Sequence, residues 1–387
     1  MKRGFAVAST TFRIPFNKPF LTGNETRYIQ AAVKSGKISG DGLFTRRCCD
    51  FFQLRYGFLR TFLTTSCTDA LEMAAILCNI KPGDEVIAPT YTFVSTVNAF
   101  ILRGARIIFA DSQPDSPNID AGELEELVTP QTKVIVPVHY GGVACDMDRI
   151  SAIARRHDLF IVEDAAQSVD SYFKSRPLGS IGHLGAFSFH ETKNVMAGEG
   201  GMLAINDERF VKRAEIVREK GTNRSAFFRG EIDKYGWVDI GSSFLPSDII
   251  AAFLLAQLEN LDRIQEKRKQ LWKRYHDGLA DLGRSGIATL PSIPEYATNN
   301  AHTFYLVCRS LEERTRLIAH LRDRGVLAVF HYQSLHRSKF FEEQHDGRAL
   351  PNADRYSDCL VRLPMYFELR LQEVDEVVGL IREAFGA

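Results

Sequence analysis

The sequence has no excess of charge of either sign and no long apolar run. Its 48 lysines and arginines balance its 48 aspartates and glutamates. A neutral chain has no global field that attracts nucleic acid or a membrane surface, so local groups must bind any anionic ligand. No apolar segment is long enough to cross a bilayer, and the basic start at residues 1–9 turns polar before a signal-length core develops. We therefore expect a cytoplasmic protein.

The seven cysteines lack the spacing of metal ligands and the even number of a disulfide framework. We expect reduced thiols and no metal site. Internal repeats and low-complexity segments are absent from the sequence as well. A chain of 387 residues is too long for one ordinary core, so we expect about two domains.

Short apolar runs alternate with amphipathic stretches between residues 81 and 206. This rhythm predicts an α/β fold with a mostly parallel sheet that is covered on both faces. The predicted strands are Glu85–Ala88, Arg106–Phe109, Lys133–Val138, Leu159–Val162, Ala186–Phe189 and Met202–Ile205. Ligands of such sheets bind beyond the carboxyl ends of the strands. Asp111, His139, Asp164 and His190 each follow a run, so we expect them to line one crevice.

A long helix is predicted to begin after Ser247, a suitable cap residue. Apolar residues then recur at helical spacing at Ile250, Leu254, Leu258, Leu261 and Ile264. We expect this helix to connect a large domain, residues 1–250 with the N-terminal segment, to a small α+β domain within residues 251–387. Strand patterns in the second part are Phe304–Val307 and Val326–Phe330.

Lys193 ends a run of residues that predicts a cofactor site. Asp164 and Gln167 follow one apolar run. The next apolar run contains Ser188 and is followed by Lys193, and a glycine-rich segment comes at 198–201. Pyridoxal phosphate chemistry needs an amine that forms a Schiff base and a carboxylate that keeps the pyridine nitrogen protonated. Taken singly, an aspartate at a strand end is usually a turn residue and a lysine is usually solvated. The prediction therefore depends on their combination.

Residues 64–73 predict a loop that enters a helix, with Ser66 and Asp69 at the spacing of a capping box. Free backbone amides and the positive end of the helix dipole suit a phosphate, although a capped surface helix fits the same residues. Because the Asp69 carboxylate would repel a phosphate, we expect its side chain to point away. Phe93 could supply a flat face for the ring, although an isolated aromatic is more often a core residue.

The order of segments 66–68, 89–96, 163–167 and 188–193 resembles the DegT/DnrJ/EryC1/StrS sugar aminotransferases, which have the aspartate aminotransferase type I fold of PLP-dependent transferases. The likeness covers nearly the whole chain. It implies that Lys193 holds pyridoxal 5'-phosphate, that Asp164 faces the pyridine nitrogen and that Gln167 approaches the ring hydroxyl. It further implies phosphate contacts from Thr68, Asp69 and Ser188, and it places Cys67 among the cofactor-binding residues.

Within that family, segments 45–48, 137–140, 188–194, 218–225 and 239–243 are similar to enzymes that aminate a nucleotide-linked 4-keto-6-deoxyhexose. The likeness implies L-glutamate as donor, pyridoxamine 5'-phosphate between two half-reactions, and a homodimer with shared active sites. Many members place an asparagine of the neighbouring subunit on the phosphate, in a Gly-x-Asn-x-Arg stretch. This chain has Ser243 there, which can still donate a hydrogen bond but with a shorter reach.

A basic segment could bind the nucleotide diphosphate, although a solvated basic loop explains it equally well. The candidate substrate residues are Asn223, Arg224, Arg229, Lys234 and Tyr235, with His331, Tyr332 and His336 as further candidates. Competing functions are a non-catalytic regulatory paralogue, a dehydratase and an amino-acid transaminase. Intact Lys193 argues against the first two, because related dehydratases have histidine at this position. The third needs arginines aimed at two carboxylates, which the sequence alone does not place.

Overall fold

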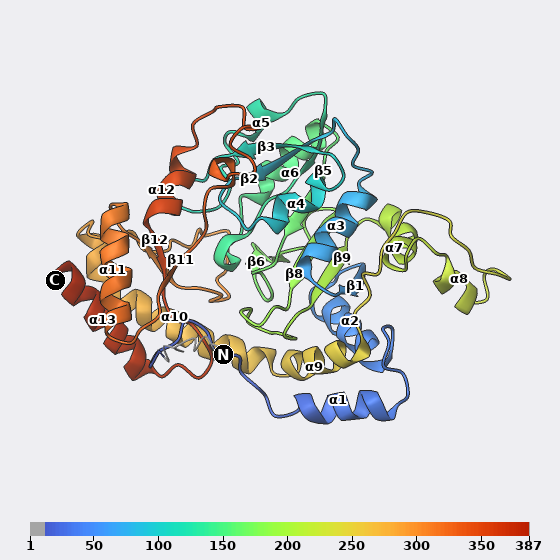
Figure 1. Cartoon of the computed structure of the whole chain (residues 1–387), viewed down its shortest axis with the longest axis horizontal. Helices are drawn as coiled ribbons and strands as arrows, with labels where there is room; N and C mark the ends of the chain where they lie inside the picture. Colours follow the sequence, from blue (N-terminus) through green and yellow to red (C-terminus); the bar gives the residue numbers. More distant parts are fainter. Residues whose placement is uncertain (1–11, 387) are drawn as a thin grey trace, which may run out of the picture.

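The computed structural model describes residues 12–386, which fold around a seven-stranded sheet and a smaller three-stranded sheet (Figure 1). The segment 1–9, with the prediction that it forms no signal peptide, lies outside the described residues. Among the described residues, no helix has the length and apolar character needed to span a bilayer. All seven cysteines lie within this range and are free thiols.

The large sheet is mostly parallel, as predicted. Its strand order is β1-β9-β8-β5-β4-β2-β3, in which β9 runs antiparallel to both β1 and β8. The strands are β1 (Arg60–Thr64), β2 (Glu85–Pro89), β3 (Arg106–Ala110), β4 (Thr132–Ile135), β5 (Phe160–Asp164), β8 (Leu184–Ser188) and β9 (Gly201–Ile205). β4 is shorter than predicted because Pro137 has no N–H to donate to the ladder. The six predicted strands are all present, and β1 is an additional one at the edge.

Alternate residues of the strands bury both faces of this sheet. On one face Val86, Val134 and Val162 join a core with helices α3, α4 and α7, and on the other Ile87, Ile135 and Ile161 pack against α5 and α6. At the β8 and β9 end, that second face is covered by α2 and α9. The helices of this part of the chain are α1 (Glu25–Lys34), α2 (Leu43–Tyr56), α3 (Cys67–Leu77), α4 (Ser95–Ile101), α5 (Leu124–Leu127), α6 (Met147–Arg156), α7 (Val211–Arg218), α8 (Arg224–Phe228) and α9 (Asp248–Leu258).

The predicted long helix is two helices, and the prediction of one was wrong. The hydroxyl of Ser247 accepts a hydrogen bond from the Ile250 N–H and starts α9 as expected. α9 then ends at Leu258, and α10 runs over Leu261–Arg284. The side-chain amide of Asn260 donates to the Ala256 carbonyl at 2.9 Å, so a side chain competes with the backbone where the chain bends.

The C-terminal part contains a three-stranded antiparallel sheet in the order β10-β12-β11. β10 (Tyr305–Val307) matches a predicted strand, β11 (Val329–Phe330) keeps only the end of another, and the central β12 (Leu360–Arg362) was not predicted. The helices of this part are α11 (Leu311–Asp323), α12 (Pro351–Cys359) and α13 (Leu371–Phe385). A domain boundary near residue 250 stays a prediction.

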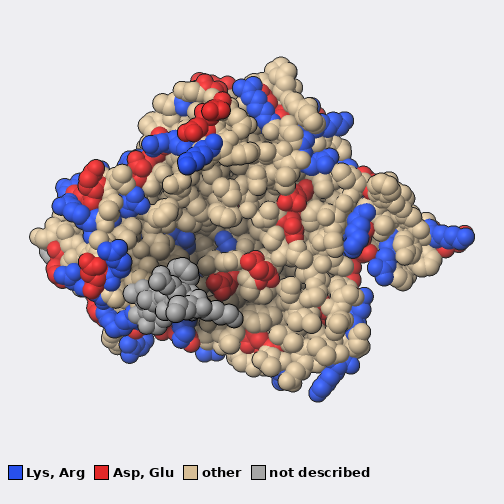
Figure 2. Space-filling model, in the orientation of Figure 1, with Lys and Arg blue, Asp and Glu red and all other residues tan. Residues whose placement is uncertain are grey.

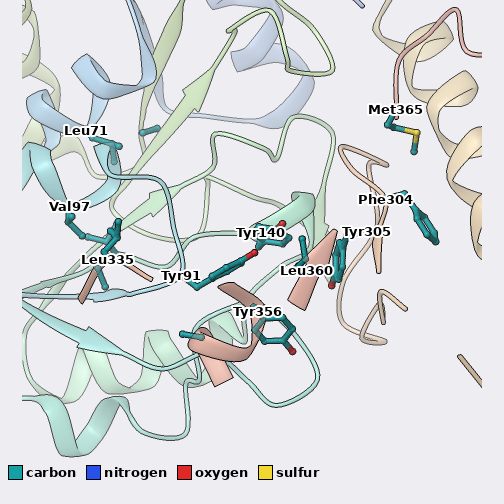
Figure 3. Close-up of a cluster of buried hydrophobic side chains, with 14 of the residues drawn as sticks. Leu71, Tyr91, Val97, Tyr140, Phe304, Tyr305, Leu335, Tyr356, Leu360 and Met365 are labelled. Atoms are coloured by element: carbon teal, nitrogen blue, oxygen red, sulfur yellow. The ribbon is translucent and has the colours of Figure 1, made fainter. Parts of the chain in front are cut away.

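Four tyrosines join the two sheets. Tyr91 follows β2 and Tyr140 follows β4, and their ring centroids are 5.6 Å apart. Tyr305 of β10 lies 5.7 Å from Tyr140, and Tyr356 of α12 lies 5.8 Å from Tyr91 (Figure 3). These contacts hold the small sheet against the loops that follow the parallel strands, which is the edge where ligands of α/β sheets bind.

Candidate active site

Lys193 lies in a compact loop between β8 and β9. The loop is closed by backbone hydrogen bonds from Phe189 N to Gly200 O at 2.8 Å and from Ala197 N to Phe189 O at 2.7 Å. Burial lowers the pKa of the Lys193 amine from 10.5 to about 8, while the charge of Asp164 opposes this shift and that of Arg362 adds to it. The amine therefore has a larger neutral, nucleophilic fraction near neutral pH than a solvated lysine has.

Asp164 ends β5, buried to 6% exposure, with its carboxylate held by two donors. Oδ2 accepts from the Thr96 hydroxyl at 2.7 Å, and Oδ1 accepts from the Ala166 N–H at 3.1 Å. The Thr96 hydroxyl is in turn 2.8 Å from that of Thr92. These two hydrogen bonds fix the direction of the Asp164 carboxylate.

Gln167 connects the β5 edge to the C-terminal part of the chain. Its Oε1 accepts from the Gly141 N–H at 2.6 Å, and its Nε2 donates to the Tyr332 hydroxyl at 3.2 Å. His331 Nδ1 lies 3.0 Å from the Tyr140 hydroxyl. Burial holds the pKa of His331 well below its usual range, so this imidazole is neutral. Two of the candidate substrate residues, His331 and Tyr332, thus belong to the same cluster as Gln167.

The N-terminus of α3 has the predicted cap. The Ser66 hydroxyl accepts from the Asp69 N–H at 3.1 Å, and the Thr65 hydroxyl donates to the Asp69 carboxylate. The Asp69 amide is therefore engaged by the cap. Within the described residues, the N–H groups of Cys67 and Thr68 donate to no protein acceptor. The Thr68 side chain donates to Ser95 at 2.9 Å.

Gly201 allows β9 to approach this helix end closely. A Cβ at Gly201 would lie 2.3 Å from the Ser66 carbonyl oxygen and 2.4 Å from the Cys67 nitrogen. The predicted phosphate donor Ser188 pairs with Gly201 across the sheet, and its hydroxyl accepts from the His190 N–H at 3.4 Å. Free amides at a helix start, a serine hydroxyl, a buried carboxylate and an amine of lowered pKa are together the groups that pyridoxal phosphate needs.

Phe93, a predicted cofactor residue, is exposed at 55%. Its ring centroid is 6.1 Å from that of Tyr332, so it borders the cluster that contains Gln167. It is not the buried core residue that an isolated aromatic usually is.

The predicted nucleotide-binding segment is separate from this cluster within one chain. Figure 1 shows α8 and the residues beside it extending from the body at the edge of the molecule. Asn223 accepts from the Gly236 N–H at 2.8 Å, and Tyr235 packs against Phe227. Arg229 pairs with both Glu215 and Glu231. The other predicted residues of this segment are Arg224, which lies over the Phe228 ring, and Lys234. Ser243, predicted as a contact of the cofactor phosphate, is exposed.

Several residues near the site were not predicted. Thr96 ends the segment 89–96, which the sequence analysis identified. Its part in the site becomes clear only from its hydrogen bond to Asp164. Asn194 follows Lys193 and bonds to Gln265 at 2.8 Å, to the Asn300 carbonyl at 2.9 Å and to His302 at 2.9 Å. These side chains are buried, so the network anchors the Lys193 loop to the start of α10 and to the segment before β10.

Arg362 of β12 is also near the site, and no local pattern in the sequence points to it. Beside the loop, Lys193 and Asn194 line a small cavity together with Asn17, Glu191 and Arg268. Figure 2 shows a hollow in the middle of this face of the molecule, with lysine and arginine atoms at its floor and acidic atoms near its rim.

A family model matches residues 20–382, and it describes the DegT/DnrJ/EryC1/StrS aminotransferase family. The chain belongs to this family. It is therefore an aminotransferase, and the expected relationship is confirmed at the level of the family. The α/β architecture with its mostly parallel sheet is the type I fold of PLP-dependent transferases.

A spore coat polysaccharide biosynthesis protein of Bacillus subtilis (strain 168) is 33% identical over 382 residues, which is 96% of each chain. A Streptococcus pneumoniae protein named as a sugar aminotransferase is 26% identical with a TM-score of 0.89, covering 97% of this chain and 99% of that one. The aminotransferase from Psychrobacter cryohalolentis is 26% identical with a TM-score of 0.89, covering 95% and 98%. The streptococcal structures include PLP and PMP forms, which confirms the predicted cofactor.

Proposed function

We propose that this chain transfers the amino group of L-glutamate to C4 of a nucleotide-linked 4-keto-6-deoxyhexose. The specific acceptor is dTDP-4-dehydro-6-deoxy-D-glucose, and the products are dTDP-4-amino-4,6-dideoxy-D-galactose and 2-oxoglutarate. Segments 218–225 and 239–243 support this choice, because they resemble the transaminase that makes this sugar for enterobacterial common antigen. The Bacillus relative, named for polysaccharide biosynthesis, supports a role in cell-surface polysaccharide synthesis.

The observation that carries the proposal is the placement of Asp164 at the end of β5 and of Lys193 after β8, two neighbouring parallel strands. Bound pyridoxal phosphate supplies an aldehyde that accepts the amino group and a ring that withdraws electrons. Lys193 removes the proton from the α-carbon of the donor and returns it to the cofactor side, acting first as base and then as acid. With a pKa of about 8, its amine can do both near neutral pH. With the cofactor bound, Asp164, fixed in direction by Thr96, would face the ring nitrogen and keep it protonated.

A homodimer with shared active sites is part of this proposal. The α8 segment extends from the edge of the molecule and Ser243 is exposed, so a neighbouring subunit could receive them beside its own cofactor. Large apolar side chains on this segment support an interface: Phe228 is 68% exposed and Trp237 is 83% exposed. In the dimer, Asn223, Arg224 and Lys234 bind the nucleotide diphosphate of the partner's substrate. A cytoplasmic location remains a prediction.

The direct test is an assay of the purified protein with L-glutamate and a panel of nucleotide-linked 3-keto and 4-keto sugars. We expect amination of the dTDP-linked 4-keto-6-deoxy sugar, with the axial 4-amino group of the galactose configuration seen by NMR. Amination at C3, or of another nucleotide sugar, would show that the proposed acceptor is wrong and that the protein is still a sugar aminotransferase. No product with any sugar, and no spectral change with glutamate, would favour a regulatory paralogue.

A further inference from the structure

Arg362 occupies the face of the small sheet that is turned toward the large sheet. Its neighbours in β12 and beyond, Val361 and Leu363, are fully buried in the core, so the alternation of the strand points Arg362 to the opposite side. On that side its cross-strand partner is Tyr305, which contacts Tyr140 of the large sheet. A charged residue therefore stands in a central strand at the junction of the two sheets.

Two contacts fix the guanidinium in this position. Nε donates to the Thr303 hydroxyl at 3.0 Å, and the central carbon lies 4.8 Å from the centroid of the Phe16 ring. Among residues 12–386, no carboxylate pairs with Arg362, and its two terminal nitrogens donate to no protein acceptor. The planar guanidinium is thus held in place, and its two terminal nitrogens are available to donate hydrogen bonds to a ligand.

This fork is close to the predicted reaction centre. Thr303, which holds Nε, is 3.4 Å from the position of a Cβ at Gly141, the residue that donates to Gln167. The preceding residue, His302, bonds to Asn194 next to Lys193. The charge of Arg362 is also among the causes that lower the pKa of Lys193 and of His331.

We propose that Arg362 binds the α-carboxylate of the amino donor. This inference rests on the proposed function and names the residue that selects its donor. An α-amino acid carries a carboxylate on the same carbon as the amine, so the cation that recognises it must be next to Lys193. A guanidinium fork binds a carboxylate through two parallel hydrogen bonds.

The diphosphate of a nucleotide sugar is a poorer match for this position. The whole hexose ring separates it from the keto carbon that receives the amine, so its cations must lie farther from Lys193 than the donor's do. Arg268, another arginine near the site, already donates to the carbonyls of Ala301 at 3.0 Å and His302 at 2.6 Å. It shapes the segment that carries Thr303, whereas both terminal nitrogens of Arg362 have no protein acceptor among residues 12–386.

The test separates the two half-reactions in the holoenzyme. Arg362→Gln and Arg362→Lys are compared with Arg274→Gln, which removes the same charge from an exposed ion pair with Asp375. Stopped-flow absorbance follows the reaction of the pyridoxal phosphate (aldehyde) form of the enzyme with L-glutamate. In a separate experiment it follows the reaction of the pyridoxamine phosphate (amine) form with the nucleotide keto sugar. Calorimetry measures binding of 2-oxoglutarate to the aldehyde form, with which it does not react, so one readout is independent of turnover.

For Arg362→Gln we expect a half-saturating glutamate concentration raised on the order of tenfold to a few hundredfold, and 2-oxoglutarate affinity lowered to match. The half-saturating keto-sugar concentration should stay within about twofold, and Arg362→Lys should recover part of the loss. The wild type should prefer glutamate to γ-aminobutyrate, which lacks the α-carboxylate, and Arg362→Gln should lose that preference. Should Arg362→Gln fail to fold, the lysine variant makes the same comparison.

Three results would overturn the inference. Unchanged glutamate kinetics in a reactive Arg362→Gln protein would remove Arg362 from donor binding and leave the proposed function intact. Loss of affinity for the keto sugar and for dTDP, with glutamate unaffected, would assign Arg362 to the diphosphate. A wild-type protein whose spectrum does not change with glutamate would overturn the proposed function and this inference together.

Discussion

Thr96 donates a 2.7 Å hydrogen bond from its hydroxyl to the carboxylate of Asp164. The donor comes from the second residue of α4, and the acceptor ends β5, so the bond ties a helix start to a strand end across the candidate site. Asp164 has only one other donor, the backbone N–H of Ala166, among the described residues. The direction of the carboxylate therefore depends on Thr96.

Replacing Thr96 with valine should slow the half-reaction with glutamate without preventing cofactor binding. A hydrogen bond to a charged group contributes about 1.5–3 kcal/mol, so we expect a loss of roughly tenfold to a hundredfold in rate. Thr96→Ser retains the hydroxyl and should keep most of the rate. A valine variant as fast as the wild type would show that Thr96 does not position Asp164.

The pH dependence of Lys193 should show its lowered pKa. Burial disfavours the ammonium form, so the free amine increases about tenfold per pH unit up to pH 8 and then levels off, whereas a solvated lysine would continue to pH ~10. The measurement is the rate at which the apoprotein captures pyridoxal, which has no phosphate to titrate. Because the Asp164 charge raises the pKa of Lys193, Asp164→Asn should move the midpoint lower. A midpoint near 10 would contradict the burial of the amine.

Gly201→Ala should weaken cofactor binding. The added Cβ would lie 2.3 Å from the Ser66 carbonyl oxygen, so β9 or the start of α3 must move, and overpacking of this kind costs about 1–3 kcal/mol. We expect a dissociation constant for pyridoxal phosphate raised by about tenfold or more, measured by fluorescence titration. Gly379→Ala is the matched control, because a Cβ there meets no atom within 4 Å. Equal affinities in the two variants would contradict a phosphate site at this helix end.

Asn194→Ala should destabilise the fold as well as the site. It leaves buried partners at Gln265, the Asn300 carbonyl and His302 without their hydrogen bonds, for which we expect a loss of about 3 kcal/mol in the free energy of unfolding. Urea unfolding of the apoprotein measures this loss. Gln270→Ala, which removes an exposed amide from α10, should change stability by less than about 0.5 kcal/mol. Similar values for both variants would show that the network is not stabilising.

The residues that follow the carboxyl ends of the parallel strands could be predicted, because each strand and the residues after it form a local pattern. Asp164, Gln167, Ser188 and Lys193 were all found in this way, and the structure places them at one edge of the sheet. The capping of α3 by Ser66 was also local and is confirmed. The individual roles of these residues toward the cofactor stay proposals.

Features that depend on tertiary contacts could not be predicted. β1 is a short edge strand whose partner in the sheet, β9, lies about 140 residues away in the sequence. At the break after Leu258 the Asn260 side chain bonds to the Ala256 carbonyl, while the apolar spacing in the sequence continues across it. Arg362 is near Lys193 only because a three-residue strand packs against the loops of the large sheet.

The central claim is that the amine of Lys193 carries the cofactor. Borohydride reduction of the holoprotein, followed by proteolysis and mass spectrometry, tests it most directly. We predict a single pyridoxyl-phosphate label on the peptide that contains Lys193, and none in Lys193→Ala. A label on any other lysine, or no label in a protein that has bound the cofactor, would contradict the account.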